Sequence, residues 1–276
     1  MDGSTSFDGF RIPNVLWDKI EKILPTYPSS SKGGRPRRNL RGIVDAIFYR
    51  LRTGCQWKAI PSCFAPGSTA HQYFQEWVEL GVFDAIWQLA LQEYDDLIGL
   101  NWSWQSADCA MTKSPLGHEE TGKNPTDRGK RGTKRSLITE ATGIPVGISV
   151  GAANMHDIRL LRSTLEDCFR RVPIDEGRGV ERLCLDKGYD SASIRKMIIE
   201  EFGYRAHIRS RGEEKSLLRD RRRKPRRWVV ERTHSWLNRF RGILIRWDKK
   251  STNYIANLQF ACAYYTFKKI MVFDRL

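Results

Sequence analysis

The chain lacks the cysteine pattern of small metal-bound or disulfide-bonded domains. Its six cysteines are scattered, with no Cys-x-x-Cys pair and no histidine at zinc-ligand spacing. Neither a zinc ribbon nor a disulfide scaffold is therefore expected, and the thiols should be reduced and mostly buried. The cysteines are Cys55, Cys63, Cys109, Cys168, Cys184 and Cys262.

Long apolar runs are absent too. No stretch approaches the ~20 apolar residues that a membrane-spanning helix needs. The N-terminus has no basic region followed by an apolar core, as a signal peptide would. We therefore expect a cytoplasmic protein.

Its 276 residues, 40% of them hydrophobic, suffice for one large domain or two smaller ones with proper cores.

Acidic residues are in short supply relative to basic ones. The chain has 47 Lys and Arg against 32 Asp and Glu, a formal charge of +15. Much of the excess lies in residues 205–250, which hold 17 Lys and Arg and 5 Asp and Glu. This balance favours a polyanionic partner, and nucleic acid is the commonest soluble one. A solvated basic face is the alternative that composition leaves open.

The first third of the chain has helical periodicity. Residues 1–10 are small and polar and are expected to be flexible, whereas 11–98 should form a small all-α domain. Residues 29–38 contain too little apolar material to pack and should form an extended arm. Helices are expected after Pro13, over about 40–51, from 67 to about 80, and over 82–97.

The helices between residues 40 and 80 resemble a helix-turn-helix, and nearby arginines could hold the DNA backbone. These arginines are Arg35, Arg37, Arg38, Arg41 and Arg50. A helical bundle with an incidental basic arm explains the same residues equally well.

Residues 99–276 have the pattern of an α/β domain. Their order is strand, strand, strand, helix, strand, helix, strand, helix, which predicts a mixed five-stranded sheet with helices on both faces. The strands are expected at 102–111, 137–140, 145–153, 183–185 and 204–208, and the helices at 157–169, 192–202 and 228–241.

Three acids distant in sequence can meet in such a sheet. Asp108 falls on the first strand, Asp186 ends the fourth, and Glu231 lies on a basic helix that can pack against them. The plain interpretation of Glu231 is an ion pair with Arg227, four residues earlier, worth only a few tenths of a kcal/mol. The alternative is a metal ligand beside a phosphate path. Two other acids, Asp157 and Asp190, are predicted to cap helices.

Basic residues flank these acids and could form a positive channel with salt-dependent phosphate contacts. They are Lys130, Arg131, Lys134 and Arg135 near the second strand, and Arg221–Lys224, Arg226 and Arg227 before the glutamate helix. Trp228, Trp236 and Trp247 could stack on unpaired bases. Aromatic residues at helical spacing are more often core, so we assign Trp236 and Phe240 to the core and leave Trp228 open.

Several blocks resemble bacterial insertion-sequence transposases of the insertion-sequence-five type. The resemblance extends from Ile12 to about Tyr265. A related signature places Tyr, Arg, Glu and Lys at fixed spacings around the glutamate. Arg227 fits its arginine position, whereas Lys224 stands at the tyrosine position and Asn238 at the lysine position. Arg239, next to Asn238, could supply the missing charge. The blocks are Arg50-Leu-Arg-Thr-Gly-Cys-Gln-Trp-Lys-Ala-Ile-Pro61, Asn124-Pro-Thr-Asp-Arg-Gly-Lys-Arg-Gly-Thr-Lys-Arg135, Gly151-Ala-Ala-Asn-Met-His-Asp157, Asp186-Lys-Gly-Tyr-Asp190 and Val230-Glu-Arg-Thr-His-Ser-Trp-Leu-Asn-Arg-Phe240.

The resemblance implies an RNase H-like core in which Asp108, Asp186 and Glu231 form the catalytic DDE triad. It implies two Mg²⁺ ions, for which Mn²⁺ can substitute, held by these carboxylates. The expected activity is cleavage at the terminal inverted repeats and joining of the 3′-hydroxyl to target DNA, by a homodimer. An inactive DNA-binding repressor and a metal-dependent nuclease without strand transfer are the alternatives.

Overall fold

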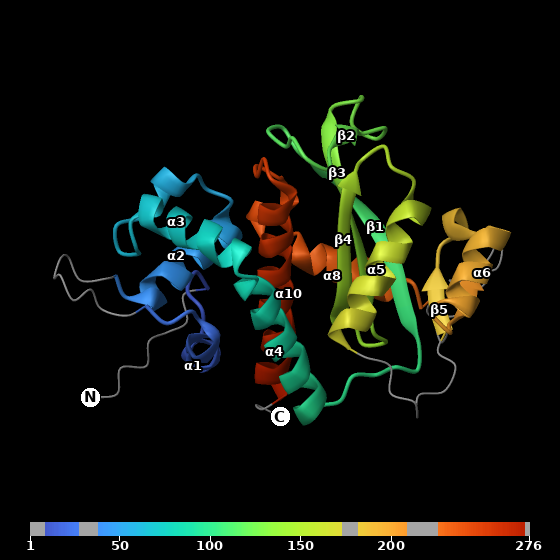
Figure 1. The fold of residues 1–276 in the computed structure, drawn as a ribbon, viewed down its shortest axis with the longest axis horizontal. Coiled ribbons are helices and arrows are strands. Elements are labelled where there is room, and N and C mark those ends of the chain that lie inside the picture. Colours follow the sequence, from blue (N-terminus) through green and yellow to red (C-terminus); the bar gives the residue numbers. More distant parts are fainter. Residues whose placement is uncertain (1–8, 28–37, 173–181, 209–225, 274–276) are drawn as a thin grey trace.

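A computed structural model describes residues 9–27, 38–172, 182–208 and 226–273. Most of the predicted flexible N-terminus and arm, including Arg35 and Arg37, lies outside these residues, as does the basic run 221–224. Within the described part, a helical unit and a mixed sheet lie side by side, with the long C-terminal helix between them (Figure 1). None of the described helices is long and apolar enough to cross a membrane.

The helical unit is close to the prediction, except for one connection. Asn39 caps α2 by accepting a hydrogen bond from the Arg41 N–H at 2.8 Å, and Gly54 ends it in the left-handed conformation. The α2–α3 connection runs from Gly54 to Pro66, longer than the turn of about 3–4 residues in a helix-turn-helix. The unit comprises α1 (Asn14–Ile20), η1 (Glu21–Ile23), α2 (Leu40–Thr53), η2 (Trp57–Ala59), α3 (Gly67–Glu79) and α4 (Val82–Leu97).

The sheet has the order β2-β3-β1-β5-β6, and β4 also pairs with β3. β1, β5 and β6 are parallel to one another, whereas β3 runs antiparallel to β1, and β2 and β4 antiparallel to β3. This topology confirms the RNase H-like mixed α/β class. The strands are β1 (Gln105–Lys113), β2 (Gly122–Lys123), β3 (Arg131–Thr139), β4 (Pro145–Ala152), β5 (Arg182–Leu185) and β6 (Arg205–Ile208).

Two details of the sheet differ from the prediction. There are six strands rather than five, because the two-residue β2 pairs with the start of β3. β3 also begins at Arg131 instead of residue 137. Its first half is charged and shows no apolar alternation, so its strand character is set by pairing with β1 and β4 and not by local sequence.

Helices cover both faces of the sheet. α5 (Asp157–Arg171) packs on β4 and β3, and α8 (Trp228–Leu237) packs on β1 and β3. Gly143, with φ of +103°, sits directly under α8, where a Cβ would press on Thr233. The Thr233 hydroxyl donates to the Gly143 carbonyl at 2.8 Å and fixes α8 on the β3–β4 turn. The remaining helices are η3 (Lys187–Tyr189), α6 (Ala192–Glu200), α9 (Arg241–Leu244) and α10 (Ser251–Phe273).

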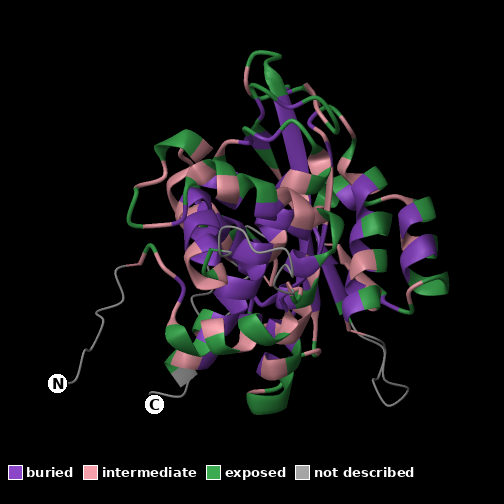
Figure 2. Cartoon of the chain, turned by 60° about the vertical axis from the view of Figure 1, so that its left-hand side comes forward, coloured by how far each residue is buried: buried purple, intermediate pink, exposed green. Residues whose placement is uncertain are grey.

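The helix α10 packs along α4, although the sequence places it in the second predicted domain (Figure 1). The buried apolar residues form one contiguous core from Ile12 to Ile270, which Figure 2 shows passing through both parts. The predicted domain boundary between residues 98 and 99 stays a prediction. The C-terminal helix belongs to the second predicted domain, but it completes the helical unit.

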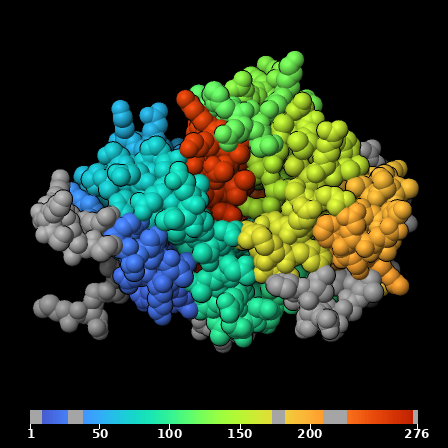
Figure 3. All heavy atoms as spheres, viewed as in Figure 1, coloured from blue at the N-terminus to red at the C-terminus, as the bar shows by residue number. Residues whose placement is uncertain are grey.

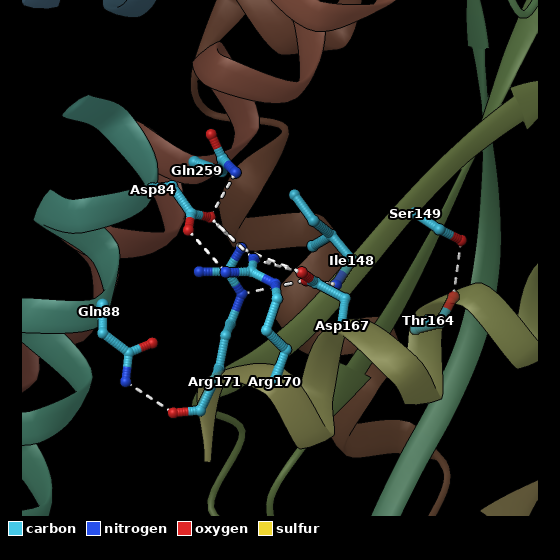
Figure 4. Close-up of polar contacts among 9 residues, drawn as sticks. All are labelled: Asp84, Gln88, Ile148, Ser149, Thr164, Asp167, Arg170, Arg171 and Gln259. Atoms are coloured by element: carbon cyan, nitrogen blue, oxygen red, sulfur yellow. Dashed lines mark hydrogen bonds and ion pairs between the residues drawn. The ribbon is translucent and has the colours of Figure 1, made fainter. Parts of the chain in front are cut away.

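A network of ion pairs and hydrogen bonds fastens the helical unit to the sheet (Figure 4). Asp84 on α4 accepts from Arg170 and Arg171 at the end of α5 and from Gln259 on α10. Arg171 is fully buried, also pairs with Asp167 at 3.0 Å, and lies 3.8 Å from the ring centre of Trp87. Asp167 also accepts from the β4 backbone, so the two carboxylates that hold Arg171 link α4, α5, α10 and β4.

Candidate active site

Asp108 and Glu231 meet at one guanidinium. Cys109 is paired with Ser136, whose hydroxyl contacts α5, so the alternation of side chains turns Asp108 to the opposite face, under α8. Arg227 Nη1 lies 2.8 Å from Glu231 Oε1 and 3.7 Å from Asp108 Oδ2. The ion pair expected from the plain interpretation of Glu231 is therefore present, and it includes a second carboxylate from the central strand.

Asp186 lies at the corresponding place directly after the neighbouring strand, β5. Ser106 of β1 pairs in parallel with Cys184 of β5, and Asp108 and Asp186 each follow that pair by two residues. Neighbouring strands are about 4.8 Å apart. The Asp186 carboxylate accepts a hydrogen bond from the Gly188 N–H, which caps η3.

The electrostatics of Asp108 reflect all three acids. The pKa of Asp108 is raised to about 6; burial is the largest cause and the charges of Asp186 and Glu231 add to it, while the Cys109 N–H and Arg227 act in the opposite direction. The charges of Asp186 and of Glu231 therefore both reach Asp108. A cation between them relieves the repulsion of these charges.

The donor chemistry of this locus fits a hard divalent cation, which prefers oxygen ligands. Within the described residues, no three Asp, Glu, His or Cys side chains are gathered into a ligand cluster. Instead the Arg227 guanidinium holds the position of a cation between Asp108 and Glu231. A metal ion would exchange with this guanidinium.

The sequence interpretation missed His234, which lies one turn beyond Glu231. Its Nε2 is 3.3 Å from the Asp108 carbonyl oxygen. Burial, assisted by the charge of Arg135, lowers the pKa of His234 to about 3. The imidazole is therefore neutral, and the contact assigns its proton to Nε2, as the donor to Asp108. The spacing of Glu231 and His234 on one helix face was the signal available in the sequence.

Several basic residues expected to face DNA are instead engaged inside the protein. Lys134 is buried and lies 2.5 Å from Asp157 Oδ1. Arg135 is buried and donates to Asn238 Oδ1. Arg50 is buried against Asp248, and Arg41 donates to the Ile12 carbonyl and to Asp45. Lys134 and Arg50 pair with carboxylates inside the fold, whereas Arg135 contacts a neutral amide; a role of these three residues in DNA binding stays a prediction.

Other basic side chains are exposed to solvent. Arg38, Lys130, Arg131 and Arg239 are exposed, and Arg239 lies over the Trp236 ring at 3.9 Å. Arg227, in contrast, is committed to the carboxylates.

The helix caps and aromatic residues differ in part from expectation. His156, not Asp157, caps α5, and Ser191, not Asp190, caps α6. Asp157 and Asp190 instead form ion pairs with Lys134 and Arg195. Phe240 is buried as predicted, and Trp236 is partly buried against the core. Trp228 lies under the Arg232 guanidinium at 4.5 Å.

Comparison with known families decides the membership of this chain. Residues 12–87 match the family described as "Putative transposase of IS4/5 family", and residues 107–266, more than half the chain, match "Transposase DDE domain". The chain belongs to the DDE-domain transposases. All three candidate acids, Asp108, Asp186 and Glu231, fall inside the second match.

Individual relatives agree with this membership. The chain is 32% identical over 156 residues to "Putative transposase for insertion sequence element IS402" of Burkholderia cepacia, covering 53% of this chain and 68% of that protein. It is 30% identical over 79 residues to uncharacterized protein y4sN of Sinorhizobium fredii, covering 28% of this chain and 63% of that protein.

Among solved structures, a pre-cleavage Mos1 transpososome is similar at 8% identity and a TM-score of 0.30, covering 94% of this chain and 88% of that one. A Mos1 paired-end complex with Mn is similar at 9% identity and a TM-score of 0.29, covering 95% and 89%. These likenesses are too low to bear on the site.

Proposed function

We propose that this DDE-family protein binds the terminal inverted repeats of an insertion sequence, cleaves DNA there and joins the freed 3′-hydroxyl to target DNA. The observation that supports it is the meeting of Asp108 and Glu231 at one guanidinium, next to the strand that Asp186 follows. Cleavage adds water across a phosphodiester bond and leaves a 3′-hydroxyl. Joining then exchanges one phosphodiester for another, so no covalent protein–DNA link is needed.

In this proposal Asp108, Asp186 and Glu231 would together hold two Mg²⁺ ions, or Mn²⁺ in their place. When bound, two such ions neutralise charge on the attacking and leaving oxygens. His234 fixes the backbone at Asp108 through its 3.3 Å contact. Of the proposed DNA contacts, Arg38, Lys130, Arg131 and Arg239 are exposed and can hold phosphates; Arg35 and Arg37 lie outside the described residues. Two ends must be brought together, so a homodimer is part of the proposal.

The products of one assay test this proposal. The protein is incubated with Mg²⁺ and DNA that carries paired terminal repeats, and the DNA is resolved by length. Cut ends together with joined products support transposition. Cutting without joining would support the nuclease alternative, and binding without cutting would support the repressor alternative.

A further inference from the structure

Asp186 belongs to a different part of the sheet from the other two acids. Residues 182–208 form one edge segment, which is made of β5, η3, α6 and β6. Figures 1 and 3 show this edge segment at one side of the molecule, next to α5. Asp108 on β1 and Glu231 on α8 lie outside it. The place of Asp186 relative to them therefore depends on how the edge segment is held against β1 and α5.

The backbone pairing between β1 and the edge segment is short. β5 pairs with β1 at two positions, of which the last joins Ser106 to Cys184. Asp108 and Asp186 both come two residues after this pair, beyond the paired register of the described strands. Backbone pairing therefore does not by itself fix the distance between these two carboxylates.

Tyr189 contacts β1 beyond this register. Its hydroxyl donates to Cys109 Sγ at 3.4 Å, and Cys109 is the neighbour of Asp108 in the chain. Residues 186–190 are all described, and among them only Tyr189 is buried, with 1% of its surface exposed. The ring of Tyr189 therefore anchors the turn that carries Asp186.

This turn is bonded to the Asp186 carboxylate itself. The Gly188 N–H donates to Asp186 Oδ1, and the Tyr189 N–H donates to the Asp186 carbonyl at 3.2 Å. A Cβ at Gly188 would lie only 2.8 Å from Asp186 Oδ1, so the turn follows the carboxylate closely. A displacement of Tyr189 would therefore move the carboxylate through the single turn of η3.

Cys109 gives the Tyr189 hydroxyl a fixed partner. Cys109 is paired across the strands with Ser136, whose hydroxyl accepts from Thr164 of α5 at 2.7 Å. Thr164 in turn contacts Ser149 of β4 at 2.7 Å (Figure 4). β1, β3, β4 and α5 are thus joined next to Cys109. The contact from Tyr189 ties the edge segment to this rigid centre of the sheet.

A second tyrosine holds the other end of the edge segment. The Tyr204 hydroxyl donates to Gln105 Oε1 at 2.8 Å, and the Tyr204 ring lies 5.7 Å from that of Phe169 on α5. Gln105 and Cys109 are four residues apart on β1, about 13 Å at ~3.3 Å per residue. The two tyrosines therefore fasten the edge segment at separate places, and Tyr189 is the one in the turn that carries Asp186.

We propose that Tyr189 is a positioning residue, whose hydroxyl contact with Cys109 sets the place of Asp186 relative to Asp108. The inference rests on the proposed function, because it concerns the metal site that these acids would form. Tyr189 acts without touching the ion or the DNA. Packing of its ring in the core is the alternative role, and phenylalanine would fulfil that role equally well.

The test therefore replaces Tyr189 with phenylalanine, which keeps the buried ring and removes the hydroxyl. Mn²⁺ is titrated into the full chain, with and without terminal-repeat DNA, and the free ion is followed by electron paramagnetic resonance. We expect the Mn²⁺ dissociation constant to rise about tenfold, the lower end of the effect of removing a residue that orients a metal ligand. Hydrogen exchange of the amides of 186–191 should become about fivefold faster, the factor for one lost hydrogen bond.

The matched control is Tyr204→Phe, which removes a hydroxyl from the other end of the same interface and should leave the Mn²⁺ affinity unchanged. Cys109→Ala should reproduce the effect of Tyr189→Phe. The double variant should lose no more affinity than either single one, because both changes remove the same contact. Cys109→Ser keeps a hydrogen-bond acceptor and should retain most of the affinity.

An unchanged Mn²⁺ affinity in Tyr189→Phe would overturn the positioning role and leave the proposed function standing, whatever the exchange rates show. An equal loss in Tyr204→Phe would also overturn it, since a general loosening of the edge segment would then be the cause. Additive losses in the double variant would reject the contact with Cys109. Absence of Mn²⁺ binding by the unmodified protein, with and without DNA, would instead overturn the metal site of the proposed function.

Discussion

Arg227 Nη1 lies 2.8 Å from Glu231 Oε1, at the start of the helix that covers the central strand. The same nitrogen is 3.7 Å from Asp108 Oδ2, so one positive charge compensates carboxylates from two elements. A divalent cation at this locus must compete with a guanidinium that already satisfies part of the charge. This competition gives the first prediction.

Replacing Arg227 with alanine should lower the stability of the protein without metal and increase the rise in Tm that Mg²⁺ causes. The uncompensated carboxylates repel one another, so we expect a loss of about 1 kcal/mol, or about 3 °C in Tm. Added Mg²⁺ should then raise the Tm more than it does in the unmodified protein. Thermal unfolding with and without Mg²⁺ measures both effects, and Arg239→Ala is the control. An Mg²⁺ response unchanged by Arg227→Ala would contradict the prediction.

His234 should act as a positioning residue. Its alanine variant loses the contact to the Asp108 carbonyl and leaves a cavity, at a cost of about 2 kcal/mol. DNA cleavage should fall further than the folded fraction does, while DNA affinity stays nearly constant. His234→Gln, which can keep a donor, should recover part of the activity. Cleavage that simply follows the folded fraction would reduce His234 to a structural role.

The ion pair between Asp84 and Arg171 should make the free energy of unfolding depend on pH. Burial alone would raise the pKa of Asp84, but hydrogen bonds from Arg170 and Arg171 and their charges outweigh it and hold that pKa below its usual range. Because the folded pKa is depressed, this stabilisation is present above the unfolded pKa of about 3.9 and is lost as pH falls through the folded value.

Asp84→Asn should therefore lower the free energy of unfolding at neutral pH by about 2 kcal/mol, since Arg171 keeps only Asp167. The difference from the unmodified protein should shrink in strong acid. Urea unfolding over a pH series measures it. Asp96→Asn, an exposed acid on the same helix, is the control. A difference that is independent of pH would show that the lost contact is not ionic.

Lys130 and Arg135 should behave differently although both were expected to contact DNA. Lys130 is exposed, so Lys130→Ala should lower DNA affinity and reduce the slope of log affinity against log salt by about 1. Arg135 is buried on Asn238, so Arg135→Ala should lower stability instead. Salt titrations of DNA binding, alongside thermal unfolding, separate the two. A reduced salt slope for folded Arg135→Ala would return that residue to the DNA surface.

The sequence predicted most elements because periodicity and breakers agree over long stretches. The helix over 82–97 is confirmed residue for residue, and the helix expected over about 40–51 is α2, which Gly54 ends in the left-handed conformation. The charged start of β3 was missed, because Lys134 becomes a strand residue only through its partners and its ion pair with Asp157. Sequence spacing also could not show that α10 packs on α4, since residues 98–250 separate the two helices.

Only part of the candidate site could be predicted from the sequence. The positions of Asp108 and Asp186 follow from strand order, because parallel neighbours bring residues at the same register together. The neutral state of His234 depends on burial by several elements, and no local pattern encodes it. The inward turn of Arg135 likewise depends on Asn238, more than one hundred residues away. Assignment of the three acids as a triad remains a prediction.

Replacing Asp186 with asparagine tests that assignment most directly. The change removes one charge at nearly constant shape, and Asp190→Asn, an exposed acid paired with Arg195, is the matched control. We expect Asp186→Asn to lower Mg²⁺-dependent strand cleavage by more than ~100-fold, with affinity for the terminal repeats nearly unchanged and Asp190→Asn close to the unmodified protein. Cleavage by Asp186→Asn at the unmodified rate would contradict the proposed triad.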